Sequence, residues 1–288
     1  ANLRSSRHDG RCVGVECRDG SVFEADAVVV AAGHSADDTY ELLSEAGATL
    51  VPKGLAVGFR VEHPQALVNH AAYGRLARRV RTGRGRTDRD NAAYLNHLHG
   101  GNLLLENDND SPLLPVAGYR LATQTRDDRS AYSFCCCPGG QVVPASTDPE
   151  LVVVNGMSFS RRDSSFANAA LVVSIAPDDP LLEPYADRGP LAALAFQRAA
   201  ERRAAELGGG GFVAPVTRLT DFLRPSRSSS GRSKPPLRSS YRLGVREANC
   251  RECFPEAVNE ALAAAVVDDF ERAIPGFICD DAIPGFIC

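Results

Sequence analysis

Residues 27–33 read Ala-Val-Val-Val-Ala-Ala-Gly, a short apolar run of mostly β-branched residues that ends at Gly33. A continuous run of this kind is typical of a strand buried on both faces in a parallel, helix-covered sheet. Residues 36–46 then carry apolar side chains at helical spacing, with Ser35 as the expected N-cap. A strand that ends in glycine beside a helix start is where open α/β sheets hold ligands, because helix N-terminal amides favour phosphate. The stretch therefore predicts an α/β fold and makes Gly33 a candidate ligand-binding position, although most strand-turn-helix units bind no ligand.

The flanking sequence supports a mixed architecture. Residues 12–18 alternate like a half-buried strand, Asp19-Gly20 is a turn pair and residues 21–24 return, which predicts a hairpin. Asn155-Gly156 is expected to form a turn that stops a buried strand, with Gly156 at positive φ. The same patterns predict further strands over 50–62, 119–143, 151–154 and 167–175, and helices over 66–80, 190–207 and 256–273.

Composition excludes several classes of function. The formal net charge of -4 leaves no overall basic field, so we expect no nucleic-acid partner. No apolar run reaches the roughly 18 residues that span a bilayer, and residues 1–11 show no secretory signal, so we expect no membrane association. Nine cysteines are an odd number and too sparse for a disulfide scaffold, which favours a reducing compartment.

Four residues are candidates for chemistry. Cys135 and Cys137 lie in a segment that ends in Pro-Gly-Gly, where a thiolate could relay electrons or attack a substrate if nearby positive charge lowers its pKa. The alternative, which sequence alone favours, is that both are small hydrophobic side chains of a strand. Asn155 follows a buried strand and could orient a substrate. Arg162, next to Asp163, could form an ion pair or clamp an anion.

A metal site is not expected. Cys250 and Cys253 have the spacing of a zinc or thioredoxin-like pair, but no second Cys/His pair follows at a suitable distance, so coincidence is the better interpretation. Residues 81–115 form a polar segment without periodicity, which predicts a long loop. His97 and His99 lie in it, as do Asp108 and Asp110, which lack the remaining ligands of a calcium loop.

Several motifs together carry a resemblance to a known family. The β-meander that leads into residues 28–33 resembles the late part of the FAD domain of flavoproteins with two dinucleotide-binding domains. Further motifs, in order, resemble the uncharacterised FAD-dependent dehydrogenase family of bacteria and plastid-bearing eukaryotes: Gly33-His34-Ser35-Ala36, Lys53, Gly58-Phe59-Arg60-Val61-Glu62-His63-Pro64-Gln65, Phe134-Cys135-Cys136-Cys137-Pro138-Gly139-Gly140, Asn155-Gly156-Met157-Ser158, Arg162-Asp163, Asn168, Phe196-Gln197, Pro215, Asp221-Phe222 and Gly276-Phe277.

The resemblance implies a fold, a cofactor and separate sets of residues for the cofactor and for the substrate. The fold would be a partial FAD/NAD(P)-binding, Rossmann-like domain at 1–50, with a mixed α+β substrate or cap domain at 51–279. FAD would carry hydride or electron transfer in the parent protein, for a small-molecule substrate in the cytoplasm or plastid stroma. Gly33, His34 and Ser35 would line the cofactor side. The turns at 135–140 and 155–158 would face the substrate.

Departures from the family pattern leave alternatives open. Cys136 stands where the family usually has methionine, residues 81–115 look like an insertion, and no Gly-x-Gly-x-x-Gly phosphate loop follows a strand. Residues 273–279 recur as 282–288, so the tail 280–288 is expected to have no place in the fold, and the Ser/Arg/Pro-rich segment 226–240 is expected to be a linker. One alternative is therefore a non-catalytic product of a truncated gene model that does not bind FAD. A weaker one is an Arg-rich RNA-binding module, which lacks aromatics for base stacking.

Overall fold

The computed structural model describes residues 2–5, 11–33, 35–80, 114–224, 237–279 and 283–287. The chain divides into two compact units, Ala1–Lys53 and Gly54–Cys288. His34 and most of the predicted loop and linker, residues 81–113 and 225–236, lie outside the described residues. The ends of that loop lie together, because Val80 and Leu114 form an isolated parallel bridge.

The first unit is built on an antiparallel meander followed by a helix. Its sheet has the order β1-β2-β3, with strands β1 (Asn2–Ser5), β2 (Cys12–Glu16) and β3 (Val22–Glu24). The amide of Gly20 donates to the Cys17 carbonyl to close the turn between β2 and β3, and φ of Gly20 is 84°. Helix α1 (Asp37–Glu45) follows, with two aspartates in its first turn. The predicted hairpin and helix are therefore confirmed.

Two local predictions for the first unit are wrong. Residues 27–33 form no strand, and Val29 is 87% exposed, because none of the described residues pairs with this segment. A strand needs a neighbour for its backbone N–H and C=O groups, and an apolar run cannot supply one. The N-cap of α1 is Ala36 and not Ser35, and no side chain caps this end.

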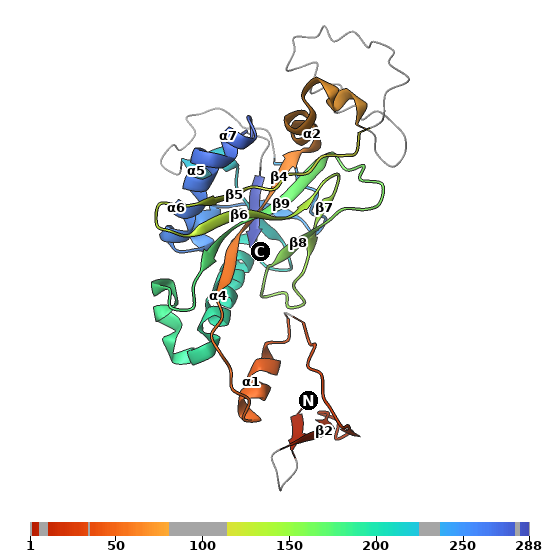
Figure 1. Ribbon diagram of the computed structural model, residues 1–288, viewed down its shortest axis with the longest axis vertical. Coiled ribbons are helices and arrows are strands. Elements are labelled where there is room, and N and C mark those ends of the chain that lie inside the picture. The colour runs from red at the N-terminus through yellow and green to blue at the C-terminus, as the bar shows by residue number, and fades with distance from the viewer. Residues whose placement is uncertain are drawn as a thin grey trace. The chain divides into compact units, whose positions relative to one another are not determined.

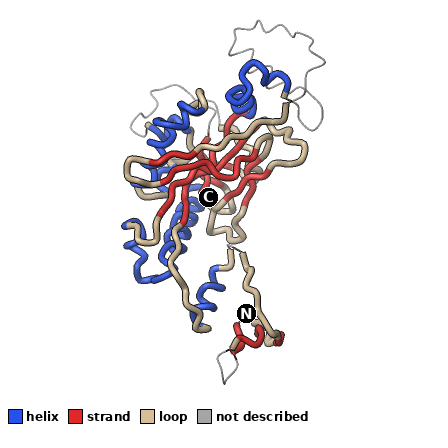
Figure 2. Tube along the Cα trace, in the orientation of Figure 1, coloured by secondary structure: helices blue, strands red, loops and turns tan. Residues whose placement is uncertain are grey.

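The second unit is organised around a seven-stranded sheet (Figures 1 and 2), in the order β11-β10-β12-β4-β9-β6-β5. All its pairings are antiparallel except β10 with β11. A separate two-stranded sheet pairs β7 with β8. The strands are β4 (Leu55–Pro64), β5 (Ala122–Gln124), β6 (Ser130–Cys137), β7 (Gln141–Pro144), β8 (Val154–Met157), β9 (Phe166–Ile175), β10 (Ala214–Val216), β11 (Val245–Glu247) and β12 (Ile283–Ile287).

Helices pack against this sheet, α4 on β10, β11 and β12, and α6 on β9 and β6. α4 ends at Gly209, whose φ of 91° supplies the left-handed C-cap that glycine adopts readily. The helical segments of the second unit are α2 (Gln65–Tyr73), the 3₁₀ helices Gly74–Arg79, Pro180–Leu191 and Cys250–Cys253, α4 (Ala192–Gly208), α5 (Leu219–Leu223), α6 (Glu256–Ala265), the π-helical turn Val266–Phe270 and α7 (Glu271–Ala273).

Alternation along β4 separates the core from a polar layer. Phe59 is buried and packs edge-on against Phe222 and Phe254, at ring-centroid distances of 5.4 and 5.2 Å. Arg60 and Glu62 point to the other face of the strand, because successive side chains of a strand alternate. Both are nevertheless fully buried. One face of β4 therefore builds the hydrophobic core, and the other buries two charged side chains.

Several predictions for the second unit need correction. Asn155 and Gly156 lie inside β8 and make no turn, and Gly156 is not among the described glycines with positive φ. The tail was expected to have no place in the fold, yet β12 inserts between β10 and β4, whose edges offer unpaired backbone groups. The end of the predicted linker is also part of the structure, because the Ser240 amide donates to Glu62 Oε1 at 3.1 Å. The fold is mixed α/β, and the large sheet of the second unit is mainly antiparallel. A parallel sheet was predicted only from residues 27–33, which form no strand.

Candidate functional site

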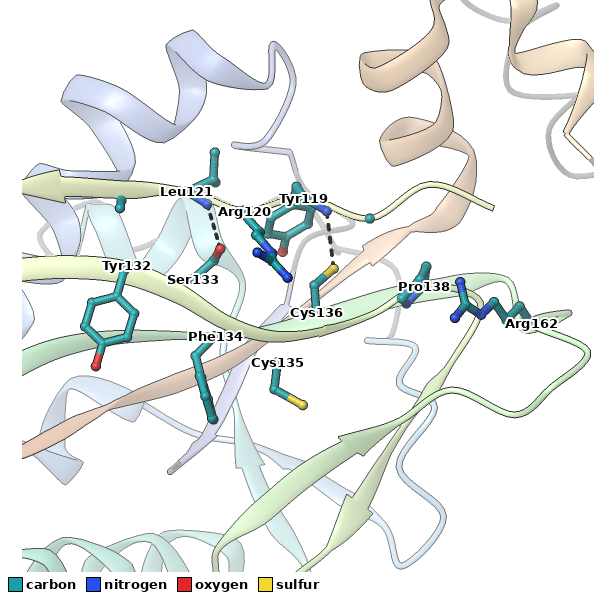
Figure 3. A pocket seen from close by; sticks show the side chains of 12 residues that line it. Tyr119, Arg120, Leu121, Tyr132, Ser133, Phe134, Cys135, Cys136, Pro138 and Arg162 are labelled. Atoms are coloured by element: carbon teal, nitrogen blue, oxygen red, sulfur yellow. Dashed lines mark hydrogen bonds between the residues drawn. The ribbon is translucent and has the colours of Figure 1, made fainter. Parts of the chain in front are cut away.

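A cleft of about 880 Å³ opens along the outer strands of the large sheet (Figure 3). Two chain segments supply most of its lining, and Arg162 contributes from a loop. Phe134 is 59% exposed, and Cys135 is exposed too. The lining residues are Gly118, Tyr119, Arg120, Leu121, Ala122, Tyr132, Ser133, Phe134, Cys135, Cys136, Pro138 and Arg162.

The cysteine segment reaches this cleft through a β-bulge in β6. Phe134 pairs with Ala170 and Cys137 with Asn168, so Cys135 and Cys136 together stand opposite one residue of β9. The backbone of Cys135 has a φ of 48°, in the left-handed region that side-chain-bearing residues seldom adopt. Bulges of this kind redirect side chains and are common next to functional sites. Here the bulge brings Cys135 to the surface while Cys137 stays buried.

A buried guanidinium holds the bulge in place. Arg60 is 0% exposed, and its Nη2 donates to the carbonyl oxygen of Cys135 at 2.6 Å and lies 3.4 Å from Cys137 Sγ. Its Nε donates to Asn168 Oδ1 at 2.6 Å, and its Nη1 lies 3.4 Å from Asn155 Oδ1. One side chain thus connects β4, β6, β8 and β9. These are charge-assisted hydrogen bonds, which are stronger than bonds between neutral groups.

Gly156 makes the space for this guanidinium. A Cβ atom at Gly156 would lie 2.0 Å from Arg60 Nη2 and 2.2 Å from Asn168 Oδ1. Real Cβ atoms do not approach other atoms that closely, so no other residue fits beside Arg60 without displacing it. The glycine of the Asn-Gly-Met-Ser motif is required by this close approach, not by a turn.

The Pro-Gly-Gly turn after the cysteines packs against the loop that carries Arg162. Gly139 has a φ of 54°, and a Cβ there would lie 2.1 Å from the Arg162 carbonyl oxygen. The Gly139 amide donates to Gln65 Oε1 at 2.6 Å, and the Ser158 hydroxyl donates to the Pro138 carbonyl at 2.9 Å. The turn therefore places the cysteine segment, the Asn155–Ser158 segment and Arg162 beside one another.

The three consecutive thiols have different environments. Burial raises the pKa of the Cys137 thiol to about 11, and the Arg60 charge offsets only part of that effect. Burial also raises the pKa of Cys136, whose sulfur accepts from the Tyr119 amide at 3.5 Å, on the other side of the strand from Cys135 (Figure 3). At neutral pH both are therefore neutral thiols. The positive charge that a reactive thiolate needs is present, but burial outweighs it at Cys137.

The structure brings most of the predicted site residues of the second unit together. Cys135, Cys137 and Asn155 all lie around Arg60, and the Cys135 sulfur is 3.9 Å from Asn155 Oδ1. Arg162 lines the same cleft from the far side of Pro138. Sequence reasoning did not single out Arg60. The sequence feature that could have revealed Arg60 is a charged residue within the apolar run of β4, on the strand face opposite Phe59.

In the first unit, Gly33 is exposed with a φ of 80°, and no atom lies within 4 Å of where its Cβ would be. Main chain at this point is therefore accessible to a ligand. The structure describes Ser35 but not His34.

Cys250 and Cys253, the other cysteine pair, are both buried in the hydrophobic core. Burial raises the pKa of Cys253 to about 12 and that of Cys250 well above its usual range. Within the described ranges no three His, Cys, Asp or Glu side chains gather as a metal site would need. Nor does that part of the chain contain a helix long and apolar enough to cross a membrane. His97, His99, Asp108 and Asp110 fall outside it.

Comparison with known proteins identifies the family. The family model described as "FAD-dependent protein, C-terminal domain-like" matches residues 102–284, which is more than half of the chain. An uncharacterized protein of Clostridium beijerinckii is 36% identical over 264 residues, which cover 91% of this chain and 42% of the relative. The chain thus spans about two fifths of the length of the curated relative that it matches. On the strength of the matched region, which holds the cysteine segment, Asn155 and Arg162, this chain belongs to the family of FAD-dependent proteins.

Proposed function

We propose that this chain is part of an FAD-dependent oxidoreductase and that a small-molecule substrate binds in the cleft beside Cys135. Membership of the FAD-dependent family supports the cofactor. The observation that carries the site is the buried Arg60, which fixes the carbonyl of Cys135, the thiol of Cys137 and the amide of Asn155 beside the cleft. A buried charge that organises an exposed bulge indicates a site where geometry matters.

The lining of the cleft supports an organic ligand. Its volume of about 880 Å³ falls within the range of roughly 300–1,000 Å³ that small-molecule sites occupy. Tyr132 and Phe134 offer aromatic surface for a planar group, while Arg120 and Arg162 offer positive charge. This combination of apolar walls and a few polar groups is the usual composition of such sites.

Within this proposal, the exposed residues around the bulge face the substrate. The Asn155 amide is exposed, and its Oδ1 is oriented by Arg60 Nη1, so its NH₂ group is available to donate to a substrate. Cys135 Sγ lies beside it. FAD, when bound, supplies the hydride or electron transfer, and the residues named here bind and orient the molecule that it acts on.

For the cofactor side, we keep Gly33, His34 and Ser35 as the proposed contacts. The exposed backbone of Gly33, with open space where a Cβ would stand, fits the close approach of a dinucleotide to main chain. The chain contains no Gly-x-Gly-x-x-Gly after a strand, so no pyrophosphate loop of that type is proposed here.

Flavin binding is tested on the protein purified at its native length and on this 288-residue chain. The native-length protein is expected to carry a flavin absorbance spectrum, and the chain is expected to bind added FAD saturably. A colourless native-length protein would overturn the oxidoreductase proposal. If the native-length protein is yellow but this chain does not bind FAD, the chain acts only as part of the longer protein.

A matched pair of variants tests the proposed contact at Gly33. Gly33→Ala and Gly20→Ala both add a methyl group in open space at nearly the same positive φ, 80° and 84°. Their backbone cost should therefore be equal, at roughly 1–2 kcal/mol. Only Gly33→Ala is expected to weaken FAD binding, because only there would the methyl group lie between main chain and cofactor. Equal affinities for the two variants would remove Gly33 from the site.

A further inference from the structure

The sulfur atoms of Cys135 and Cys137 lie 3.9 Å apart. Residues two apart in a regular strand are separated by about 6.6 Å along its axis, so their sulfurs do not usually meet. Here the bulge shortens the separation, because Cys135 adopts a φ of 48° and the pairing with β9 shifts between Phe134 and Cys137. To reach the disulfide bond length of about 2.05 Å, the sulfurs need to approach by roughly 2 Å.

The two thiols differ in access in a way that suits a reactive pair. Cys135 is exposed and lines the cleft, whereas Cys137 is 5% exposed and lies behind it. A reagent in the cleft can reach the Cys135 sulfur first, and Cys137, whose sulfur lies 3.9 Å away, is placed to resolve the product. Cys136 is not a competitor, because its sulfur accepts from the Tyr119 amide on the other side of the strand (Figure 3).

Arg60 favours an anionic sulfur at this place. Its Nη2 lies 3.4 Å from Cys137 Sγ and also holds the Cys135 carbonyl, so a positive charge is already fixed beside the Cys137 sulfur when that thiol ionises. Fixed donors cost no reorganisation when a negative charge develops. Strained backbone such as that of Cys135 is also concentrated at functional sites, where the surrounding contacts maintain it.

We propose that Cys135 and Cys137 are a redox-active dithiol that exchanges with small-molecule disulfides and closes to a reversible Cys135–Cys137 disulfide. The Cys135 thiolate attacks one sulfur of the small disulfide, forms a mixed disulfide and releases one thiolate. Cys137 then gives up its proton and attacks Cys135 Sγ, which forms the internal bond and releases the second thiolate. Overall, the two protein thiols lose two electrons and two protons, and the small disulfide becomes two thiols.

This proposal goes beyond the flavin assignment and does not depend on it, because every contact that it uses lies within residues 60–168. A reversible disulfide also agrees with the reducing compartment expected from cysteine usage, where disulfides are usually transient and catalytic or redox-sensing.

The test uses the full 288-residue chain without FAD, incubated with oxidised and reduced glutathione at graded ratios. Free thiols are alkylated, and the peptide that contains both cysteines is weighed. In oxidising mixtures we expect this peptide to carry an alkyl group on Cys136 alone, with Cys135 and Cys137 joined and two hydrogen atoms lost. In reducing mixtures we expect it to carry three alkyl groups. The buried Cys250–Cys253 pair in the same sample is the internal control, and it should stay alkylatable only after unfolding, without forming a disulfide.

Variants assign the order of the steps. Cys137→Ser is expected to accumulate glutathione on Cys135, and Cys135→Ser is expected to leave Cys137 reduced. Cys136→Ser is expected still to form the Cys135–Cys137 disulfide. The proposal is overturned if unchanged protein holds glutathione on Cys135 while Cys137 stays free, or if the pair is no more readily oxidised than Cys250 and Cys253. The measurement on unchanged protein decides the matter even if a variant of the buried Cys137 fails to fold.

Discussion

Arg60 Nη2 donates to the carbonyl oxygen of Cys135 at 2.6 Å, across 75 residues of sequence. The bond joins the polar face of β4 to the bulge of β6, and the same guanidinium bonds Asn168 on the strand between them. The bulge is therefore fixed by a buried charge as well as by strand pairing. The position of the exposed Cys135 depends on this one side chain.

Arg60→Met is expected to destabilise the protein by about 2–6 kcal/mol. The variant leaves at least two acceptors, Asn168 Oδ1 and the Cys135 carbonyl, without their donors, at about 1–3 kcal/mol for each buried group. Denaturant unfolding measures the loss. The control is Arg242→Met, an exposed arginine whose change should stay within about 0.5 kcal/mol. Equal stabilities would mean that Arg60 does not hold the bulge.

Local sequence patterns correctly predicted those helices and turns that depend on residues close together in the sequence. The hairpin around Asp19-Gly20 and helix α4 with its glycine C-cap depend on turn chemistry and helical periodicity, both of which are visible in the sequence. A strand was predicted over 167–175 because that run is largely apolar, and β9 spans Phe166–Ile175 with nearly all of its residues buried. Residues 27–33 show the limit of this reasoning, since the same kind of run forms no strand where the described residues provide no partner.

The site was predicted in part. The Cys-Cys-Cys-Pro-Gly-Gly and Asn-Gly-Met-Ser segments stand out in the sequence, and both lie around Arg60. What the sequence does not reveal is the bulge at Cys135 or the burial of Arg60, because both depend on strand register between residues far apart in the chain. The role of Gly156 was mistaken for the same reason. Asn-Gly usually marks a turn, whereas here its glycine leaves room for a side chain that comes from β4.

Gly156→Ala is expected to destabilise the protein by about 3 kcal/mol, the upper end of the usual cost of overpacking, because its methyl group would collide with the buried Arg60 Nη2 and Asn168 Oδ1. Gly210→Ala is the comparison, since Gly210 has a φ of 85° and open space around it. That variant carries only the backbone strain, roughly 1–2 kcal/mol. Thermal or denaturant unfolding of both variants distinguishes the two effects. A smaller loss for Gly156→Ala than for Gly210→Ala would contradict the close packing at Arg60.

His63 is expected to make the protein sensitive to acid. Burial lowers its pKa from 6.5 to about 4, although the Phe277 carbonyl, which accepts from Nε2 at 2.9 Å, and the charge of Glu271 act in the opposite direction. Because the folded-state pKa is depressed, the neutral His63 contributes to the free energy of unfolding in full above pH 6.5, and this contribution is lost as the pH falls through about 4. It amounts to about 3 kcal/mol at 1.36 kcal/mol per pKa unit.

The measurement is the free energy of unfolding at several pH values across that window, for unchanged protein and for His63→Gln. Glu62 also contributes to the pH dependence of the unchanged protein, because burial raises its pKa. A raised pKa stabilises the folded state at low pH, and this stabilisation is lost as the pH rises. The difference between the two proteins removes this effect. We expect the pH dependence of His63→Gln to be weaker by about 3 kcal/mol over the window. Parallel curves would show that His63 does not titrate as its burial implies.

Phe134→Ala is expected to leave stability unchanged within about 0.5 kcal/mol, because the side chain is 59% exposed and lines the cleft. Phe196→Ala is the contrasting variant, since Phe196 is 2% exposed in the core and its truncation should cost about 3–5 kcal/mol. A large aromatic side chain that contributes nothing to folding is available to contact a ligand. We therefore expect Phe134→Ala to weaken ligand binding in the cleft without lowering the free energy of unfolding. If Phe134→Ala unfolded as readily as Phe196→Ala, the ring would be part of the packed interior, and the cleft would lose its main aromatic wall.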